Sequence, residues 1–271
     1  MDSAISYDGR NTGSTTMTLS GGSSWDDDEL LTLTASAGFF TALDVGNEIH
    51  FYDSDDRVLI RFSIKSFSSS TVVQGKSNVS VPEELQGLSS LNWARAVDVV
   101  SGAWHLEGED VSIFADSFVV ASPNNNQYPV KTVFNGTVNL GKCYAVIHIG
   151  IPFISDIETL DVDTAQGETI SNKKKNVSNV TGRFEETRGV FIGPMPPSDD
   201  SEDPLENLIE LKIREAEGMD DPCELLTGTV DLNIQAHWNN NGRVFMRQVD
   251  PLPMSLLSVV GEGLFPFKGG S

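Results

Sequence analysis

The sequence is poor in cysteine and in long apolar runs, and each shortage excludes a class of protein. Its 271 residues include two cysteines, Cys143 and Cys223, too few for a disulfide framework. Neither has a second cysteine or a histidine at metal-ligand spacing, so both are expected to be reduced thiols. No segment approaches the roughly 20 apolar residues that cross a bilayer. The polar N-terminus also lacks the apolar core of a signal peptide. We therefore expect a soluble protein made in a cytosol.

Basic residues are scarce as well. Lysine and arginine number 18 against 39 aspartate and glutamate residues, which gives a net charge of −21. Tight binding of nucleic acid needs basic side chains against phosphate, and binding to an anionic membrane surface needs them too. The charge instead fits plain solubility, or a surface past which DNA slides without sticking.

Catalytic and metal-binding patterns are missing. The four histidines, His50, His105, His148 and His237, share no ligand spacing. The sequence has no Gly-x-Ser-x-Gly nucleophile elbow and no Gly-x-x-x-x-Gly-Lys phosphate loop. We expect no enzyme activity, no bound metal and no cofactor.

The remaining candidates for catalysis or metal binding are carboxylate side chains. Glu107 and Asp116 are the pair best placed for a glycoside hydrolase, which needs carboxyl groups ~5 Å or ~6.5–9.5 Å apart. We favour instead a structural role, in which the chain corner around Glu107 forms hydrogen bonds within the fold. The cluster at residues 53–56 lacks the glycine and the distant glutamate of a calcium loop and predicts a turn. The clusters at 26–28 and 199–200 are expected to be solvated.

The composition favours an all-β fold of antiparallel sheets. There are 24 glycines and 12 prolines, and short apolar runs alternate with polar turns. Residues 45–52 and 57–64 predict a hairpin, and residues 70–75 a third strand. We predict that residues 13–100 form a small β-barrel or sandwich, inserted into a main β framework of residues 1–12 and 101–271.

The second half predicts further strands at 228–234, 243–249 and 255–260. Asn241-Gly242 is a strong hairpin signal, so the first two of these strands are expected to pair. Apolar residues at 205, 208, 209 and 213 predict a short helix over 205–217, and another short helix is expected between 82 and 96.

One basic run interrupts the acidic chain. Lys173, Lys174 and Lys175 lie in strand-like sequence. An exposed hairpin end with no partner and an electrostatic contact, to an acidic neighbouring subunit or to passing DNA, are both consistent with this run.

Several segments, taken in order, resemble the C-terminal half of the tail nozzle proteins of short-tailed bacteriophages, also called tail tubular protein B. No one segment is specific, and the resemblance rests on their order and spacing. They are residues 2–9, 105–108, 111–116, 146–153, 156–160 and 241–254.

The resemblance implies a β-sandwich or propeller-like framework and a structural role in a virion tail. Proteins of this family form a ring, usually of six copies, below the portal and its adaptor. They contact tail fibre proteins, and phage DNA passes through their channel without specific binding. The protein would be assembled in the host bacterial cytoplasm. Family members are longer, so a fragment, a shortened version or one piece of a split gene is expected.

The alternative is a glycan- or receptor-binding β module of a phage tail. In that case exposed aromatic residues among Trp25, Trp93 and Trp104 would form the sugar-binding platform. The opposing interpretation is that these tryptophans belong to the core.

Overall fold

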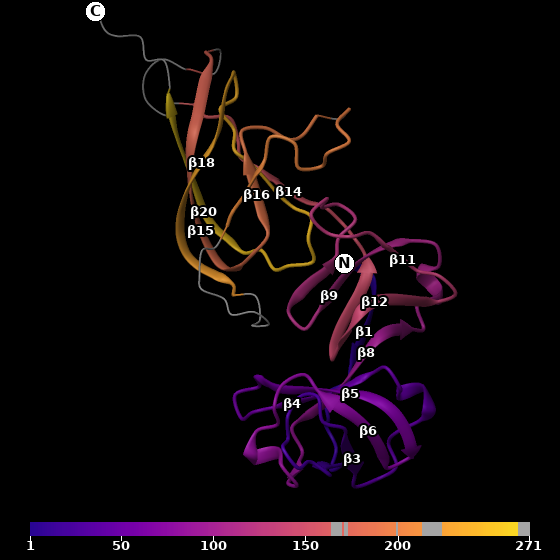
Figure 1. The fold of residues 1–271 in the computed structure, drawn as a ribbon. Helices are drawn as coiled ribbons and strands as arrows, with labels where there is room; N and C mark the ends of the chain where they lie inside the picture. The colour runs from indigo at the N-terminus through magenta and orange to yellow at the C-terminus, as the bar shows by residue number, and fades with distance from the viewer. Residues whose placement is uncertain (164–169, 171–172, 199, 213–223, 265–271) are drawn as a thin grey trace, which may run out of the picture. The chain divides into compact units, whose positions relative to one another are not determined.

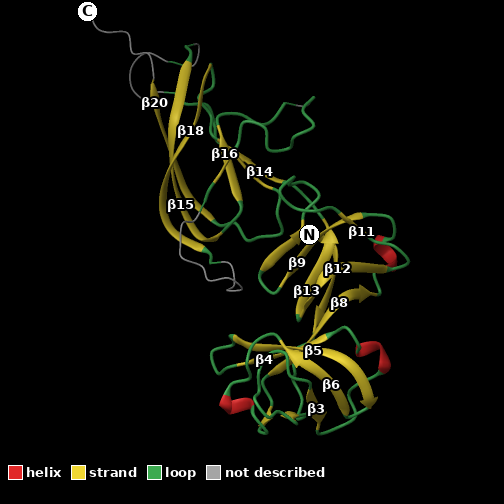
Figure 2. Ribbon diagram, in the orientation of Figure 1, coloured by secondary structure: helices red, strands yellow, loops and turns green. Residues whose placement is uncertain are grey.

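The computed structural model describes residues 1–163, 170, 173–198, 200–212 and 224–264. Within them the fold is all-β, as predicted (Figure 2). Helical structure in this part is limited to single 3-10 turns, η1 (Ala42–Asp44), η2 (Glu83–Leu85) and η3 (Trp104–Leu106). No helix in it is long and apolar enough to cross a membrane.

The chain divides into two compact units, and each is described by itself. Unit 1 comprises residues 1–3, 109–131 and 150–271, and unit 2 comprises residues 4–108 and 132–149. The predicted boundaries at residues 13 and 100 differ from this division. Residues 132–149, assigned to the framework from the sequence, belong with unit 2.

Unit 2 is built on an eight-stranded antiparallel sheet (Figure 1). Its strands, in spatial order, are β12 (Thr137–Tyr144), β8 (Trp93–Ser101), β4 (Glu48–Tyr52), β5 (Val58–Ser69), β6 (Val72–Ser77), β3 (Leu31–Ala35), β2 (Met17–Ser20) and β7 (Ser89–Ser90). The order ends at β12 and β7, so among the described residues the sheet does not close into the predicted barrel. The predicted edge at residue 100 falls inside β8, which pairs with β4 on one side and β12 on the other.

Alternation of apolar and polar residues builds the core of unit 2. In β3 the side chains of Leu31, Leu33 and Ala35 are buried while the intervening threonines are half-buried. Phe51 and Phe62 complete the same core from β4 and β5. Burying a side chain of this size stabilises a fold by about 1.5–3 kcal/mol.

The predicted hairpin around residues 53–56 is confirmed. β4 and β5 pair antiparallel, and Asp53 Oδ1 accepts hydrogen bonds from the main-chain amides of Asp55 (2.8 Å) and Arg57 (2.9 Å). The aspartate therefore serves the turn, as its side chain commonly does.

Unit 1 contains a β-sandwich (Figure 1). One sheet has the order β18 (Leu226–Asn239), β15 (Lys175–Thr187) and β20 (Leu256–Leu264). The other has the order β14 (Ser155–Glu158), β19 (Phe245–Gln248), β16 (Val190–Gly193) and β17 (Ile209–Glu210). Val180 and Phe184 of β15 share a core with Ile192 of β16 and Met246 of β19, so the two sheets pack face to face. A hairpin of β9 (Asp110–Ala115) and β10 (Phe118–Ala121) completes this unit.

The hairpin predicted at Asn241-Gly242 is wrong. β18 and β19 lie in different sheets of the sandwich, so the turn carries the chain from one sheet to the other. Asn239 explains the turn, because its Oδ1 accepts hydrogen bonds from the main-chain amides of Asn241 (3.0 Å) and Gly242 (2.6 Å).

The two predicted helices are also wrong where the structure describes them. After a turn closed by the Leu208 amide and the Leu205 carbonyl (3.1 Å), the chain enters β17, in which Ile209 pairs with Ile192. Residues 213–217 of that prediction lie outside the described residues. Between 82 and 96, the single turn η2 gives way to strands.

Candidate functional site

The three-stranded sheet of unit 1 has one face in the core and one face in solvent. In β18, Val230, Leu232 and Ile234 pack against the sandwich core, while Asp231 and Asn233 between them are exposed. This period of two is what a half-buried strand requires. On the outer face the Thr181 hydroxyl of β15 donates a hydrogen bond to Asp231 Oδ1 at 2.5 Å.

Within the part of the chain that the structure describes, both outer strands of this sheet have an open edge. β15 pairs with β18 on one side and with β20 on the other, and no other described strand pairs with either outer strand. Three large apolar side chains of β20 are exposed: Leu257 (54%), Val260 (55%) and Leu264 (65%). An open edge with exposed apolar side chains is a ready template for pairing with another chain.

The lysine run at the start of β15 does not act as one patch. Lys174 is exposed and Lys173 half-buried, whereas Lys175 is fully buried. The Lys175 ammonium donates a hydrogen bond to the Asn240 carbonyl at 2.7 Å, so it ties β15 to the turn after β18. Lys175 is therefore not available for the predicted contact with a neighbouring subunit or with DNA, because its side chain is buried. A contact through Lys173 and Lys174 stays a prediction.

Two arginines, Arg247 of β19 and Arg243 just before that strand, form ion pairs with carboxylates of the same unit. Arg247 forms a two-pronged ion pair with Asp156, with both nitrogen–oxygen distances 2.8 Å, across paired strands β19 and β14. Arg243 pairs with Glu158 at 3.0 Å and with Asp161. These hydrogen bonds raise the pKa of both guanidinium groups. Their charges are balanced locally, which makes them poor candidates for holding phosphate.

Glu107 supports a turn of unit 2. Its Oε1 accepts a hydrogen bond from the Asn135 amide at 2.8 Å, and its Oε2 accepts one from the Gly136 amide at 2.7 Å. This agrees with the expected hydrogen bonding within the fold. Asp116, its proposed catalytic companion, lies in unit 1 in the turn between β9 and β10, with φ at +45°.

The histidines do not gather into a metal site. His50 is buried in β4, where its Nε2 lies 3.1 Å from Glu48 Oε2. Burial alone raises the pKa of Glu48, but hydrogen bonds from His50 and Ser63 outweigh it and leave the pKa lowered. In the part of the chain that the structure describes, no three histidine, cysteine or acidic side chains are grouped to hold a metal.

A scan of protein-family models finds no match for the chain, and a search of curated proteins finds none either.

Glu29 is a structural anchor that the sequence interpretation missed when it assigned the neighbouring aspartates to a solvated loop. Its carboxylate accepts hydrogen bonds from the main-chain amides of Ser23 (2.7 Å), Ser24 (3.1 Å) and Trp25 (2.7 Å). These hydrogen bonds lower the pKa of Glu29 to about 2, and the bond from Ser23 contributes most. The aspartates at 26–28 are exposed, as predicted.

The three tryptophans proposed as a sugar platform have different environments. Trp93 is buried and its indole N–H donates to the Thr15 carbonyl at 2.9 Å, and Trp25 packs against the core of unit 2. Trp104 is 69% exposed. Its ring lies against Gly136, where an added Cβ would come within 2.4 Å of it. Phe134, in the same turn as Gly136, is 70% exposed. Two large aromatic side chains, Trp104 of η3 and Phe134 of the neighbouring turn, are thus exposed to solvent.

The Cys143 thiol is free, and burial raises its pKa to about 12. It is therefore a poor nucleophile at neutral pH. Cys223 lies outside the described residues.

Proposed function

We propose that this chain is a structural protein of a bacteriophage short tail, and that copies of it form part of the nozzle ring through which DNA is ejected. The ring would hold six copies below the portal and its adaptor, and would contact tail fibre proteins. The ordered segments that resemble the nozzle proteins support this proposal. The all-β fold is consistent with it.

The observation that carries the proposal is the pair of open edges in the sheet β18-β15-β20. β18 and β20 are different strands on opposite sides of β15. If β18 of one copy pairs with β20 of the next, every contact is heterologous, and a ring closes when the rotation per copy divides a full turn without a shift along the axis. The exposed Leu257, Val260 and Leu264 would then be covered by the neighbouring copy.

The charge of the chain suits a DNA channel. Each copy carries a net charge of −21, and a ring multiplies that charge around one axis. Carboxylates on the lumen would repel phosphate and lower the friction on the passing DNA. Lysine substitutions of lumen carboxylates should slow ejection and leave assembly intact, and normal ejection by such mutants would argue against this role.

Electron microscopy of the purified protein tests the assembly directly. The proposal predicts closed rings of one copy number with a central channel. A Val260→Lys variant should give few or no rings, because it places a charge in the proposed contact. Val58→Lys is the control, since Val58 is a similarly exposed strand residue (40%) of unit 2. Isolated particles or open filaments of the unmodified chain would reject the proposal.

The exposed aromatic side chains of Trp104 and Phe134 in unit 2 favour a second candidate, a glycan-binding module. Trp104 and Phe134 offer apolar faces of the kind on which sugar rings stack. Glycan-array binding that Trp104→Ala abolishes, with the thermal unfolding midpoint unchanged, would favour this candidate. Trp238→Ala in unit 1 is the matched control, because Trp238 is also half-exposed (50%).

A further inference from the structure

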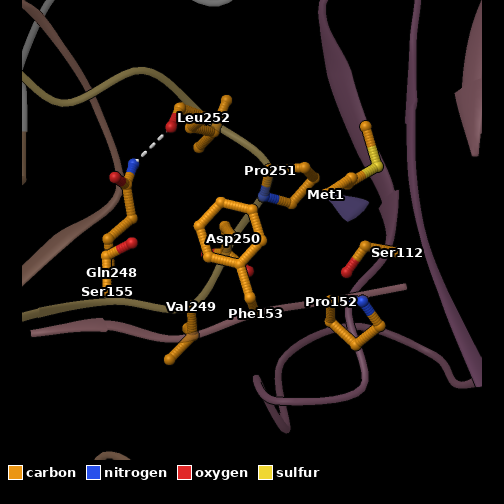
Figure 3. Close-up of a pocket in the computed structure, with 10 residues that line it drawn as sticks. All are labelled: Met1, Ser112, Pro152, Phe153, Ser155, Gln248, Val249, Asp250, Pro251 and Leu252. Carbon is orange, nitrogen blue, oxygen red and sulfur yellow. Dashed lines mark hydrogen bonds between the residues drawn. The ribbon is translucent and has the colours of Figure 1, made fainter. Parts of the chain in front are cut away.

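Unit 1 contains a cavity of about 270 Å³ whose polar groups serve the fold itself (Figure 3). Its lining includes parts of β9, β14 and β19 and the loop that follows β19. Asn125 and Ser122 hydrogen-bond to the Asp250 carboxylate. Gln248 Nε2 donates to the Leu252 carbonyl at 2.6 Å, which Figure 3 shows as a dashed line. The lining residues lie outside β18, β15 and β20, so a partner on that sheet leaves the cavity unchanged.

The sheet β18-β15-β20 is regular over five consecutive rows of paired residues. Residues 179–183 of β15 pair without a register shift with residues 233–229 of β18 and with residues 262–258 of β20. Paired residues share a face, and successive rows alternate between the two faces. Val180 and Leu232 pack in the sandwich core, whereas Thr181 and Asp231 meet on the outer face. The sheet therefore has one apolar and one polar face.

The polar face is weakly acidic. β15 contributes Asn179, Thr181 and Arg183 to it, in alternate rows. Asp231 of β18 and Glu262 of β20 are exposed in the flanking strands. Two carboxylates against one guanidinium leave this part of the face with a negative balance. Such a surface does not hold phosphate tightly.

The sandwich core is incompletely covered at both open edges of this sheet. Val230 and Leu232 of β18 pack against the core but are only half-buried. Leu256 and Val259 of β20 are in the same position at the opposite edge. Phe184 of the central strand is 1% exposed. A strand added at each edge would remove this apolar surface from water.

Strand directions determine how two copies can meet in a ring. β18 and β20 each run antiparallel to β15, so they run parallel to each other. Rotation about a ring axis preserves the direction of a strand relative to that axis. β20 of one copy therefore lies parallel to β18 of the next, and the seam between the copies is a parallel ladder. A two-fold dimer would instead pair an edge with the same edge of its partner.

We propose that the sheets of all copies in the nozzle ring join through these parallel seams into one closed β-barrel, with the polar face lining the channel. This inference rests on the proposed ring of six copies. The other face of the sheet is covered by the sheet β14-β19-β16-β17 of the same copy, which places that second sheet outside the barrel.

The size of the barrel suits the passage of DNA. Three strands from each of six copies give 18 strands. With strands about 4.8 Å apart and tilted by about 40°, the barrel measures about 36 Å between opposite backbones. Side chains reduce the channel to roughly 25 Å, which is wide enough for a DNA duplex.

Oxidation of cysteine pairs tests the seam, in a background that lacks Cys143 and Cys223. Each double variant has one new cysteine in β18 and one in β20, on the polar face; the positions are Thr229, Asp231 and Asn233 in β18 and Ser258, Val260 and Glu262 in β20. At least one of the pairs should give a covalent ladder that reaches six copies. The single-cysteine variants are the controls and should stay at the mass of one copy. Covalent dimers of a single variant would indicate a two-fold contact and contradict the seam.

A gold label tests which face lines the channel. Thr181→Cys, in the same background, is labelled with a small maleimide–gold cluster and viewed by electron microscopy. The label should lie inside the ring. Glu202→Cys is the control, because Glu202 is exposed in the loop between β16 and β17 of the second sheet, and its label should lie at the periphery.

The outcomes separate the barrel from the ring. Rings with the Thr181 label outside, or rings in which no cysteine pair gives a ladder, would overturn the barrel and leave the ring proposal standing. Absence of rings would overturn both.

Discussion

The carboxylate of Glu107 accepts a hydrogen bond from the main-chain amide of Gly136 at 2.7 Å, across 29 positions of the chain. Its other oxygen accepts one from Asn135. Asn135 and Gly136 have φ angles of +52° and +63°, the pattern of a type I′ hairpin turn, and the Phe134 and Thr137 amides and carbonyls close that turn. A carboxylate that was the best catalytic candidate in the sequence therefore holds a turn in place.

Replacing Glu107 by alanine should lower the free energy of unfolding by about 1 kcal/mol, because two amides lose their acceptor at a partly exposed site. Glu109→Ala, at a neighbouring exposed position, should have little effect. Chemical denaturation of both variants measures the difference. Equal stability of the two would show that the Glu107 bonds contribute nothing to the fold.

Lys175→Ala should destabilise the protein by about 2 kcal/mol or more, since it empties a fully buried volume and removes the hydrogen bond to Asn240. Lys174→Ala should stay within about 0.5 kcal/mol, as exposed substitutions usually do. Thermal and urea unfolding would compare them. If Lys174→Ala proved the more damaging, the assignment of the buried lysine would be wrong.

Glu29→Gln should destabilise the protein in a way that depends on pH. The folded-state pKa of Glu29 is lowered to about 2, so the carboxylate contributes stability that is present above its ordinary pKa of 4.5 and is lost as pH falls through about 2. The gap between the unfolding midpoints of the two proteins should thus narrow between pH 5 and pH 2. A gap that stays constant over this range would contradict the account.

Asp250→Asn should behave in the opposite sense. Burial raises the pKa of Asp250 above 3.8, although hydrogen bonds to the carboxylate partly offset this. Its contribution is therefore most favourable below pH 3.8 and is lost as pH rises through the folded-state pKa. The stability of Asp250→Asn relative to the unmodified protein should increase with pH across that window. A relative stability that falls with pH would contradict the assignment.

Local patterns in the sequence predicted local structure well. The alternation in residues 45–64 and the aspartates at 53–56 correctly gave a hairpin, because a turn and its two flanking strands are specified by neighbouring residues. The strands predicted at 70–75 and 255–260 correspond to β6 (Val72–Ser77) and β20 (Leu256–Leu264).

Sequence patterns whose outcome depends on tertiary contacts gave wrong predictions. Of the two Asn-Gly pairs, the one at 241–242 was expected to form a hairpin, but Asn239 directs that turn from one sheet to the other. The pair at 135–136 forms a tight turn, closed by hydrogen bonds between Phe134 and Thr137, and was overlooked. Residues 205, 208 and 209 have helical spacing, yet pairing with Ile192 places Ile209 in a strand.

The buried contact between Asn125 and Asp250 could not be predicted from the sequence. The two residues are 125 positions apart, and only the fold brings the Asn125 amide within 2.9 Å of the Asp250 carboxylate. A buried carboxylate also looks the same in a sequence as the many exposed ones of this acidic chain.

The mass of the purified protein in solution, measured by light scattering after size exclusion at moderate salt, tests the central claim most directly. We predict a mass near six times 29.4 kDa for the unmodified chain. Val260→Lys should reduce it to that of one copy and Val58→Lys should leave it unchanged. A clean monomer of the unmodified chain at micromolar concentration would contradict the claim that its open sheet edges build a ring.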